Sequence, residues 1–477
     1  MNSQLLLLAS AALGVGILAV QRWRQALIAA MVLLVLEGAI RKWLLPAQQD
    51  FVYFAKDALL LAAYAGYVKD RGWARIAQPR LPGFYLLLAA STAWYALEVF
   101  NPQLPNLLVG LLGFKAYLLY APLVWVIPAA FPETRSLARF VRWYALLAIP
   151  VGLLASLQFL APGSSPLNTY ARLDGGAGPV GFGTSSFIRV TGTFSYITGF
   201  ATYLQVTALL LLVILAVTRW RLRGNLLVYG ALGLTLTGMF MSGSRGPVYI
   251  LALTFPMFLW MSFLREREKV QTFARVGLGI GILVAMLGAT GTEAAEAFYQ
   301  RATQSTDTVG RIFEPFKSPI DAFDRAGLFG VGIGATHQTA VAVTPGQRPY
   351  SWLEGAMIEA EPGRVMLELG IVGFVLNYAL RFYLVVVAFQ QIWTLRGSFH
   401  RAIAISAFLF FLVSIPGGMV FNVTADLYYW FFAGLLTLVM RLDLRARAAV
   451  RRSAVCARNE SPERLVRRPP DLRPAAS

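Results

Sequence analysis

The chain has 477 residues, of which 57% are hydrophobic and 14% charged, and its formal net charge is +18. Apolar runs long enough to cross a bilayer recur along its whole length, which excludes a soluble globular protein and predicts a polytopic membrane protein. The basic residues lie mostly in short clusters between these runs, as orientation signals do, so nucleic acid is not an expected partner. With one cysteine, Cys456, and two histidines, His337 and His400, we expect no disulfide, metal or cofactor.

The apolar runs predict an all-α fold with about twelve or thirteen transmembrane helices. In chain order the expected spans cover residues 4–20, 25–40, 51–68, 81–100, 107–131, 138–160, 197–218, 225–242, 247–263, 276–292, 365–393, 402–420 and 427–440. The first span is the weakest of these, because its short link to the second could belong to a hairpin. Residues 1–24 lack the basic start and the cleavage site of a signal peptide, so we expect them to remain in the mature protein.

Alternate connections between the spans are basic. Together with the tail after Met440 they hold 28 of the 42 Lys and Arg residues, which places them in the cytoplasm and the other connections in the periplasm or outside the cell. The predicted organisation is therefore transmembrane helices over 1–291, one large outward loop over 292–364, further helices over 365–440, and a disordered basic cytoplasmic tail over 441–477.

Arginines recur where outward segments meet the membrane. Arg245 lies in the turn "SGSRG", where Gly243 and Gly246 permit a sharp bend that exposes backbone N–H groups. Arg189, Arg311 and Arg364 stand in similar positions next to other spans. A guanidinium at this depth can bind a phosphate or diphosphate at the bilayer surface. The alternative is that these side chains simply reach lipid headgroups.

Four stretches around these arginines resemble the O-antigen ligase and O-antigen polymerase superfamily of bacterial membrane glycosyltransferases. They are "RVTGTFSYITGFATYL", "SGSRG", "GRIFEPFKSPIDAFDRAGLFGVGIG" and "LELGIVGF", in the order that the family shows. The resemblance covers roughly residues 189–375. Before residue 180 the chain resembles the family only in being hydrophobic.

The resemblance implies a metal-independent glycosyltransferase with a GT-C-like fold in the bacterial inner membrane and an active site that faces the periplasm. Its donor would be an oligosaccharide on undecaprenyl diphosphate, and its acceptor a glycan or a lipid. Membrane lipids would surround it, and its partners could include polysaccharide export or chain-length proteins. Arg189 and Arg245 match arginines that hold the diphosphate, and Arg311 matches the family's Gly-Arg segment. We add Arg364 to the expected diphosphate ligands because of its position.

The sequence departs from the family at the residue expected to act as base. Ligases often carry a His-Asn pair about nine residues before the glutamate of Glu-x-Gly, and here Glu359 occupies that position, with Glu361 beside it. This favours a polymerase or another ligase-like branch over lipid A ligation. We predict Glu359 as the general base and Glu361 as the second candidate. The two carboxylates could instead stabilise a helix start, and His337 is an alternative base whose spacing does not match.

Charged residues inside predicted spans need partners or a polar cavity. Lys56, Asp57 and Lys115 are such residues, and they could pair with one another or line the substrate groove. The "GVGIG" segment lacks the spacing and the strand-helix context of a dinucleotide site. Two other functions stay open: a transporter or flippase for a lipid-linked glycan, and a non-catalytic subunit of a polysaccharide assembly machine.

Overall fold

The computed structural model describes residues 14–72, 81–171, 178, 180–181, 188–218, 222–264, 308–337, 340, 343–344 and 360–460. This part of the chain is all-helical, apart from one isolated bridge between Gly181 and Ile188. Helices suit the apolar runs because a lipid environment requires every backbone N–H and C=O group to be bonded within the protein. Each predicted span that falls on described residues is helical.

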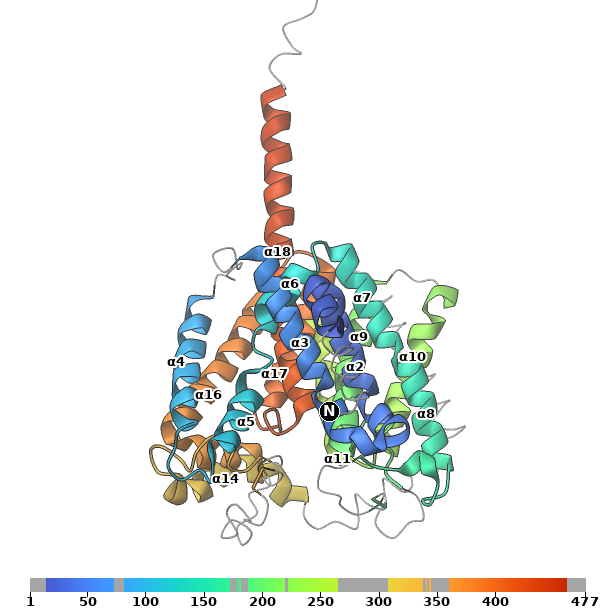
Figure 1. The fold of residues 1–477 in the computed structure, drawn as a ribbon. Coiled ribbons are helices and arrows are strands. Elements are labelled where there is room, and N and C mark those ends of the chain that lie inside the picture. The colour runs from blue at the N-terminus through green and yellow to red at the C-terminus, as the bar shows by residue number, and fades with distance from the viewer. Residues whose placement is uncertain are drawn as a thin grey trace, which may run out of the picture.

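The helices form one bundle (Figure 1). Their bounds are α2 Trp23–Ala39, α3 Gln49–Arg71, α4 Pro82–Glu98, α5 Leu107–Leu118, α6 Leu123–Ala130, α7 Thr134–Leu146, α8 Ala148–Leu160, α9 Ile197–Val217, α10 Leu222–Met241, α11 Arg245–Phe263, α14 Thr308–Ala326, α16 Glu361–Thr394, α17 Ser398–Ser414 and α18 Val423–Glu460. A π-helical turn, Ile40–Leu44, follows α2. The helices α9 and α18 are buried over most of their apolar length and form the centre of the bundle.

The fold is that of a polytopic membrane protein. Within the described residues, five helical segments are long and apolar enough to cross a membrane: Pro46–Arg71, Thr134–Leu160, Ile197–Val217, Glu361–Thr394 and Val423–Ser453. A sixth would be α5 with α6, which are bent by 44° at their junction, so the predicted span 107–131 is broken. Asn225–Met241 and Ser398–Ser414 are shorter apolar helices. The predicted span 276–292 and most of 4–20 lie outside the described residues.

Two helices extend beyond their predicted boundaries. Residues 441–460 were expected to be disordered, but α18 continues through Glu460, because its polar part is rich in Ala and Arg, which favour helix. The helix α16 begins at Glu361 instead of residue 365, and its backbone is broken at Gly370, where φ is 64°. Only glycine adopts that conformation readily, so the "ELG" motif marks a kink near the start of this span.

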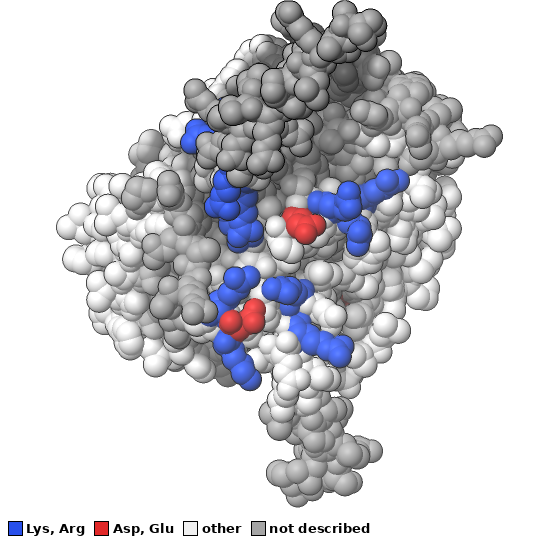
Figure 2. Space-filling view, turned by 90° about the horizontal axis from the view of Figure 1, so that it is seen from above, with Lys and Arg blue, Asp and Glu red and all other residues white. Residues whose placement is uncertain are grey.

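At one end of the bundle the predicted cytoplasmic connections meet. The Asp443 carboxylate of α18 accepts a hydrogen bond from the backbone N–H of Arg396 at 3.1 Å and pairs with Arg447 at 2.6 Å. Beside it, Thr134 Oγ1 lies 2.9 Å from His400 Nε2. Figure 2 looks onto the end where α18 leaves the bundle and shows Lys and Arg gathered around a few acidic side chains. The basic connections that the sequence places in the cytoplasm therefore lie together at this end of the bundle.

The predicted outward connections meet at the opposite end. Asn101 Nδ2 donates to the carbonyl of Gly330 at 3.2 Å, which ties the α4–α5 link to the segment after α14. Lys42 Nζ donates to the carbonyl of Gly192 at 2.7 Å, which ties the end of α2 to the segment before α9. All four predicted motif stretches have their described residues at or near this end.

Candidate functional site

The glycine-rich segment "GVGIG" is a packing element. Gly330, Gly332 and Gly334 have φ angles of 77°, 105° and 84°, which side chains with a Cβ rarely adopt. A Cβ on Gly334 would lie 2.5 Å from the carbonyl oxygen of Val109 on α5, and one on Gly330 would lie 2.5 Å from the carbonyl oxygen of Glu368 on α16. The segment therefore fits between these two helices and carries the next residues into the bundle.

Arg364, on the first turns of α16, is held by that segment. Its Nε donates to Thr336 Oγ1 at 3.1 Å, and its terminal nitrogen donates to the carbonyl of Thr336. Its guanidinium carbon lies 3.6 Å from the centre of the Phe421 ring. A guanidinium on an aromatic face is fixed in orientation and keeps edges available for further donation. Arg364 is only half-buried, so it can still meet a ligand.

Glu368 completes this arrangement one turn later on α16. Its carboxylate is fully buried and accepts hydrogen bonds from the backbone N–H and Oγ1 of Thr336, both at 2.7 Å. It also accepts one from the hydroxyl of Tyr117 on α5, at 3.0 Å. Since both carboxylate oxygens are engaged, Glu368 positions Thr336, and through it Arg364.

Glu361, the second predicted base, is engaged in a buried ion pair. Its Oε1 lies 2.7 Å from a terminal nitrogen of Arg381, and both side chains are 2% exposed. Its Oε2 accepts hydrogen bonds from the backbone N–H groups of Met419, at 2.5 Å, and Phe421, at 3.2 Å. These three donors hold the carboxylate in place, and its side chain is 2% exposed, so a substrate hydroxyl has little access to it. This geometry fits a residue that fixes the α17–α18 turn against α16.

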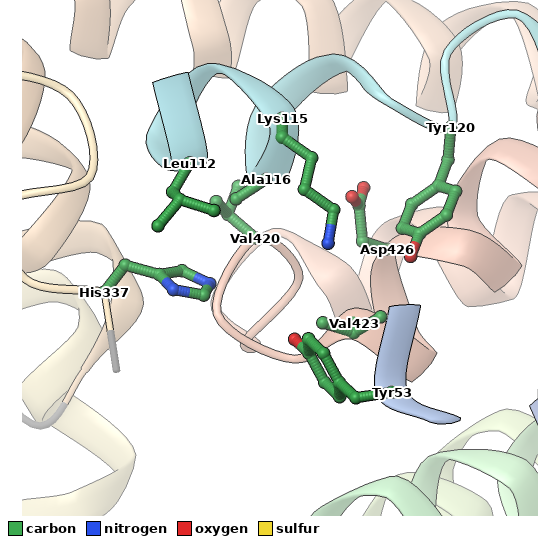
Figure 3. Close-up of a pocket in the computed structure, with 9 residues that line it drawn as sticks. All are labelled: Tyr53, Leu112, Lys115, Ala116, Tyr120, His337, Val420, Val423 and Asp426. Atoms are coloured by element: carbon green, nitrogen blue, oxygen red, sulfur yellow. The ribbon is translucent and has the colours of Figure 1, made fainter. Parts of the chain in front are cut away.

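A narrow pocket opens beside this cluster (Figure 3). The space between its walls is about 320 Å³ when the open solvent at its mouth is included, and the interior has room for about one water molecule. Side chains from α3, α5, α18 and the loop after α14 line it: Tyr53, Leu112, Lys115, Ala116, Tyr120, His337, Val420, Val423 and Asp426. In Figure 3 the Lys115 amine reaches into this space from α5 above it, and the His337 ring from the loop at the left. The cavity therefore presents a cation and an imidazole at the predicted outward end.

His337 is held neutral at pH 7. Burial, together with the positive charges of Arg364 and Lys115, lowers the pKa of its imidazole to about 4. An anionic ligand placed between these cations would offset their charge and raise that pKa. The ring also lies against Phe421, with the ring centres 6.2 Å apart. His337 is therefore half-buried, with its ring at the wall of the cavity.

Lys115 joins the cavity to a network of charges inside the bundle. Its amine lies 2.5 Å from the Asp57 carboxylate on α3, which also accepts a hydrogen bond from Tyr120 at 2.7 Å. In the same region Glu37 of α2 pairs with Lys56 at 2.6 Å. The intramembrane charges thus pair with one another, and Lys115 lines the cavity as well.

Asp426, at the start of α18, is the residue in the cavity that sequence reasoning missed. Its side chain is 1% exposed, and the Trp430 indole N–H lies near its carboxylate without forming a hydrogen bond of good geometry. Burying a poorly partnered carboxylate is costly, so such a group is commonly retained for function. Its place just after a short outward link, in "NVTADLYYWFF", was the available signal, but a single Asp beside an apolar run does not reveal a cavity.

A second arginine cluster lies at the turn between α10 and α11. Arg189 Nε donates to the carbonyl of Ser242 at 3.0 Å, and a terminal nitrogen donates to Ser244 Oγ at 2.7 Å. Gly243 makes the turn with φ of 61°. Arg245 follows directly as the first residue of α11 and is half-buried. The structure therefore brings the "RVTG" and "SGSRG" stretches together, as two parts of one site would require.

The end of α2 connects the Arg189 region to the cavity. Lys42 donates to Thr191 Oγ1 at 3.1 Å, and burial lowers the pKa of its amine to about 7. Arg41 donates to Ser195 Oγ at 2.9 Å and lies 3.4 Å from Glu37, which belongs to the charge network behind Lys115. Arg41 and Lys42, in the π-helical turn after α2, thus link the Arg189 region to the charge network that contains Lys115.

Two predicted catalytic residues cannot be placed. Arg311 lies on the first turn of α14, but its side chain is outside the described atoms, and Glu359 is outside the described residues. Among the residues that the structure describes, no three His, Cys, Asp or Glu side chains come close enough to hold a metal ion together.

No protein-family model matches the sequence, and no curated protein is significantly similar to it. Function must therefore be argued from the residues and their geometry.

Proposed function

We propose that this protein is a membrane glycosyltransferase that polymerises or ligates a glycan carried on a polyprenyl diphosphate, at the periplasmic face of the bacterial inner membrane. The observation that carries the proposal is the cavity that Lys115 and His337 both line, with Arg364 beside it. Fixed cations around a cavity at the membrane surface suit a lipid diphosphate, whose charged head lies there while its chain stays in the bilayer. The resemblance of four ordered sequence stretches supports the same class.

The reaction needs charge stabilisation at the leaving group. The acceptor oxygen attacks the anomeric carbon, the bond from that carbon to the diphosphate oxygen breaks, and the diphosphate keeps the electron pair. Cations fixed before the reaction stabilise the charge that develops on the diphosphate, and removing one such donor commonly costs about 10² to 10³ in rate. Arg364, Lys115 and the Arg189 and Arg245 pair are the groups proposed for this role.

The acceptor hydroxyl must also lose a proton. Within the described part of the chain, Asp426 and His337 are the cavity groups that can accept it. Glu361 is not favoured, because its oxygens are bonded to Arg381, Met419 and Phe421. Glu359 stays a prediction from the sequence. A base positioned at the acceptor contributes about 10² to 10⁴ in rate.

The charges inside the bundle support a second candidate function. Buried networks such as Glu37 with Lys56 and Asp57 with Lys115 also line transport paths through membranes. A transporter or flippase for a lipid-linked glycan would bind the same ligand but would leave its glycan unchanged. Binding alone therefore cannot separate the two functions.

The deciding experiment is glycan transfer by purified protein in nanodiscs, with a polyprenyl-diphosphate oligosaccharide as donor and product length read on gels. We expect wild type to extend or transfer the glycan and Arg364→Ala to lose at least about 10² in rate. Arg325→Ala serves as the matched control, because Arg325 is an exposed arginine at the same end, on α14. If wild type binds the donor and moves it between leaflets without altering the glycan, the transporter replaces the enzyme.

A further inference from the structure

The helix α14, Thr308–Ala326, has three distinct sides. One packs on α16: Ser318 Oγ accepts a hydrogen bond from the backbone N–H of Gly363 at 3.1 Å, and Ala322 and Ala326 pack in a small core with Leu367. Because the packed side consists of small residues, α14 lies close against α16 with its long axis fixed. Figure 1 shows α14 lying across the ends of α4, α5 and α16.

The second side is polar. Lys317 and Asp321 are one turn apart, their charged atoms are 3.8 Å from each other, and their side chains are 76% and 55% exposed. Asp324 and Arg325 are exposed on the same side. These residues are solvated, as expected for a helix in an outward loop.

The third side is apolar and exposed. Phe313, Phe316, Ile320 and Phe323 are 63%, 64%, 73% and 44% exposed, and their spacing of three, four and three residues places them in one stripe along the helix. Four large apolar side chains open to water are not expected in a stable soluble loop. Something apolar must therefore cover this stripe.

The end of α14 contacts another helix that exposes apolar side chains. Just after α14, Leu328 and Phe329 are also exposed, and the Phe329 ring stacks on Trp94 of α4 with centres 5.7 Å apart. The next exposed apolar residues are Leu97 and Phe100, at the end of α4. Tryptophan is enriched where a transmembrane helix leaves the hydrocarbon, so Trp94 marks the level at which α14 lies.

We infer that the stripe of α14 is embedded in the outer leaflet, so that α14 is an interfacial helix lying along the bilayer surface. An amphipathic helix binds in this way when its apolar side enters the acyl boundary and its charged side stays in water. Lipid is favoured over a second copy of the chain because the stacking of Phe329 on Trp94 joins the end of α14 to α4, whose own end exposes Leu97 and Phe100. This inference does not rest on the proposed enzyme activity.

Neighbouring labels on α14 test the inference in the full chain. The single cysteine, Cys456, is replaced by serine, and an environment-sensitive fluorophore is attached to Phe316→Cys or, as matched control, to Lys317→Cys. The variants are placed in nanodiscs, with spin-labelled phospholipid as quencher from the membrane and iodide as quencher from water. Labels at adjacent residues lie at nearly the same position along the helix axis but project from different sides of the helix.

We expect the label at 316 to emit at shorter wavelength and to be quenched severalfold more by spin-labelled lipid than the label at 317, and iodide to show the reverse order. Equal quenching of both labels by iodide, with none by lipid, would overturn the inference. If 316 is shielded from both quenchers while 317 is open to iodide, a protein surface covers the stripe, and a second copy or another subunit replaces lipid as its partner.

Discussion

Replacing Glu361 with glutamine separates a structural carboxylate from a catalytic one. The substitution keeps the shape of the side chain but removes the charge that faces Arg381, whose guanidinium is 1% exposed. Breaking a buried ion pair by changing one partner costs about 3 to 5 kcal/mol, mostly because the other charge is left buried without compensation. The two backbone N–H groups of Met419 and Phe421 can still donate to the amide oxygen, so we expect a value near the lower limit, about 3 kcal/mol.

The loss is measured by equilibrium unfolding in mixed micelles of dodecyl maltoside and sodium dodecyl sulfate, followed by circular dichroism. The double variant Glu361→Gln with Arg381→Met should recover at least about half of the lost free energy, because removing the second charge relieves its desolvation. A Glu361→Gln variant that keeps wild-type stability but loses glycan transfer would refute this reasoning and restore Glu361 as the base.

Three further predictions concern the cavity and its walls. Gly334→Ala should lower the free energy of unfolding by about 1 to 3 kcal/mol, because φ of 84° strains any other residue and the added Cβ meets α5. In the same mixed-micelle assay the control Gly230→Ala, whose new Cβ has no atom within 4 Å, should lower the free energy of unfolding much less. The pKa of His337 is about 4 in the folded protein and 6.5 in an ordinary imidazole, so the unfolded chain binds the proton more readily. The free energy of unfolding should therefore fall as the pH drops from 6.5 to 4, by at most about 3 kcal/mol. His337→Gln should remove this part of the pH dependence, and an unchanged profile in the variant would contradict the prediction. Lys115→Gln should slow transfer by about 10² or more if its amine meets the diphosphate, whereas unchanged single-turnover rates would assign Lys115 to its pair with Asp57 alone.

The sequence predicted the helices, and which of their connections lie at the same end of the bundle, better than it predicted the site. Length and hydropathy of each run were enough to locate α9 or α16, and the basic clusters near Arg396 and Arg447 identified the connections that meet at one end. Gly370 shows where sequence reasoning stops. Its kink accompanies a close contact with the backbone of Leu328, which lies in a different segment, and no local sequence pattern predicts that contact.

The site was predicted only in part, because its members interact across long separations. The resemblance implies that Arg189 and Arg245 hold one diphosphate, which stays a prediction; the structure does join their two stretches, through the bonds of Arg189 to Ser242 and Ser244. Spacing could not tell whether Glu361 would face a substrate or Arg381, twenty residues further along α16. Asp426 was missed for the same reason, since its importance comes from the cavity around it.

The insertion of the glycine-rich segment between α5 and α16 bears on how the protein is made. Trp94 on α4 bonds to Leu369 on α16 across 275 residues of sequence, and Gly334 fills a gap beside Val109 on α5. A ribosome delivers α4 and α5 to the membrane long before these partners exist. The early helices must therefore wait in the bilayer, with Lys115 already paired to Asp57, until the segment after α14 and the start of α16 have been made and can fold against them. The cavity is then the last region to form, and a chain truncated before α16 would insert into the membrane without acquiring a place to bind its ligand.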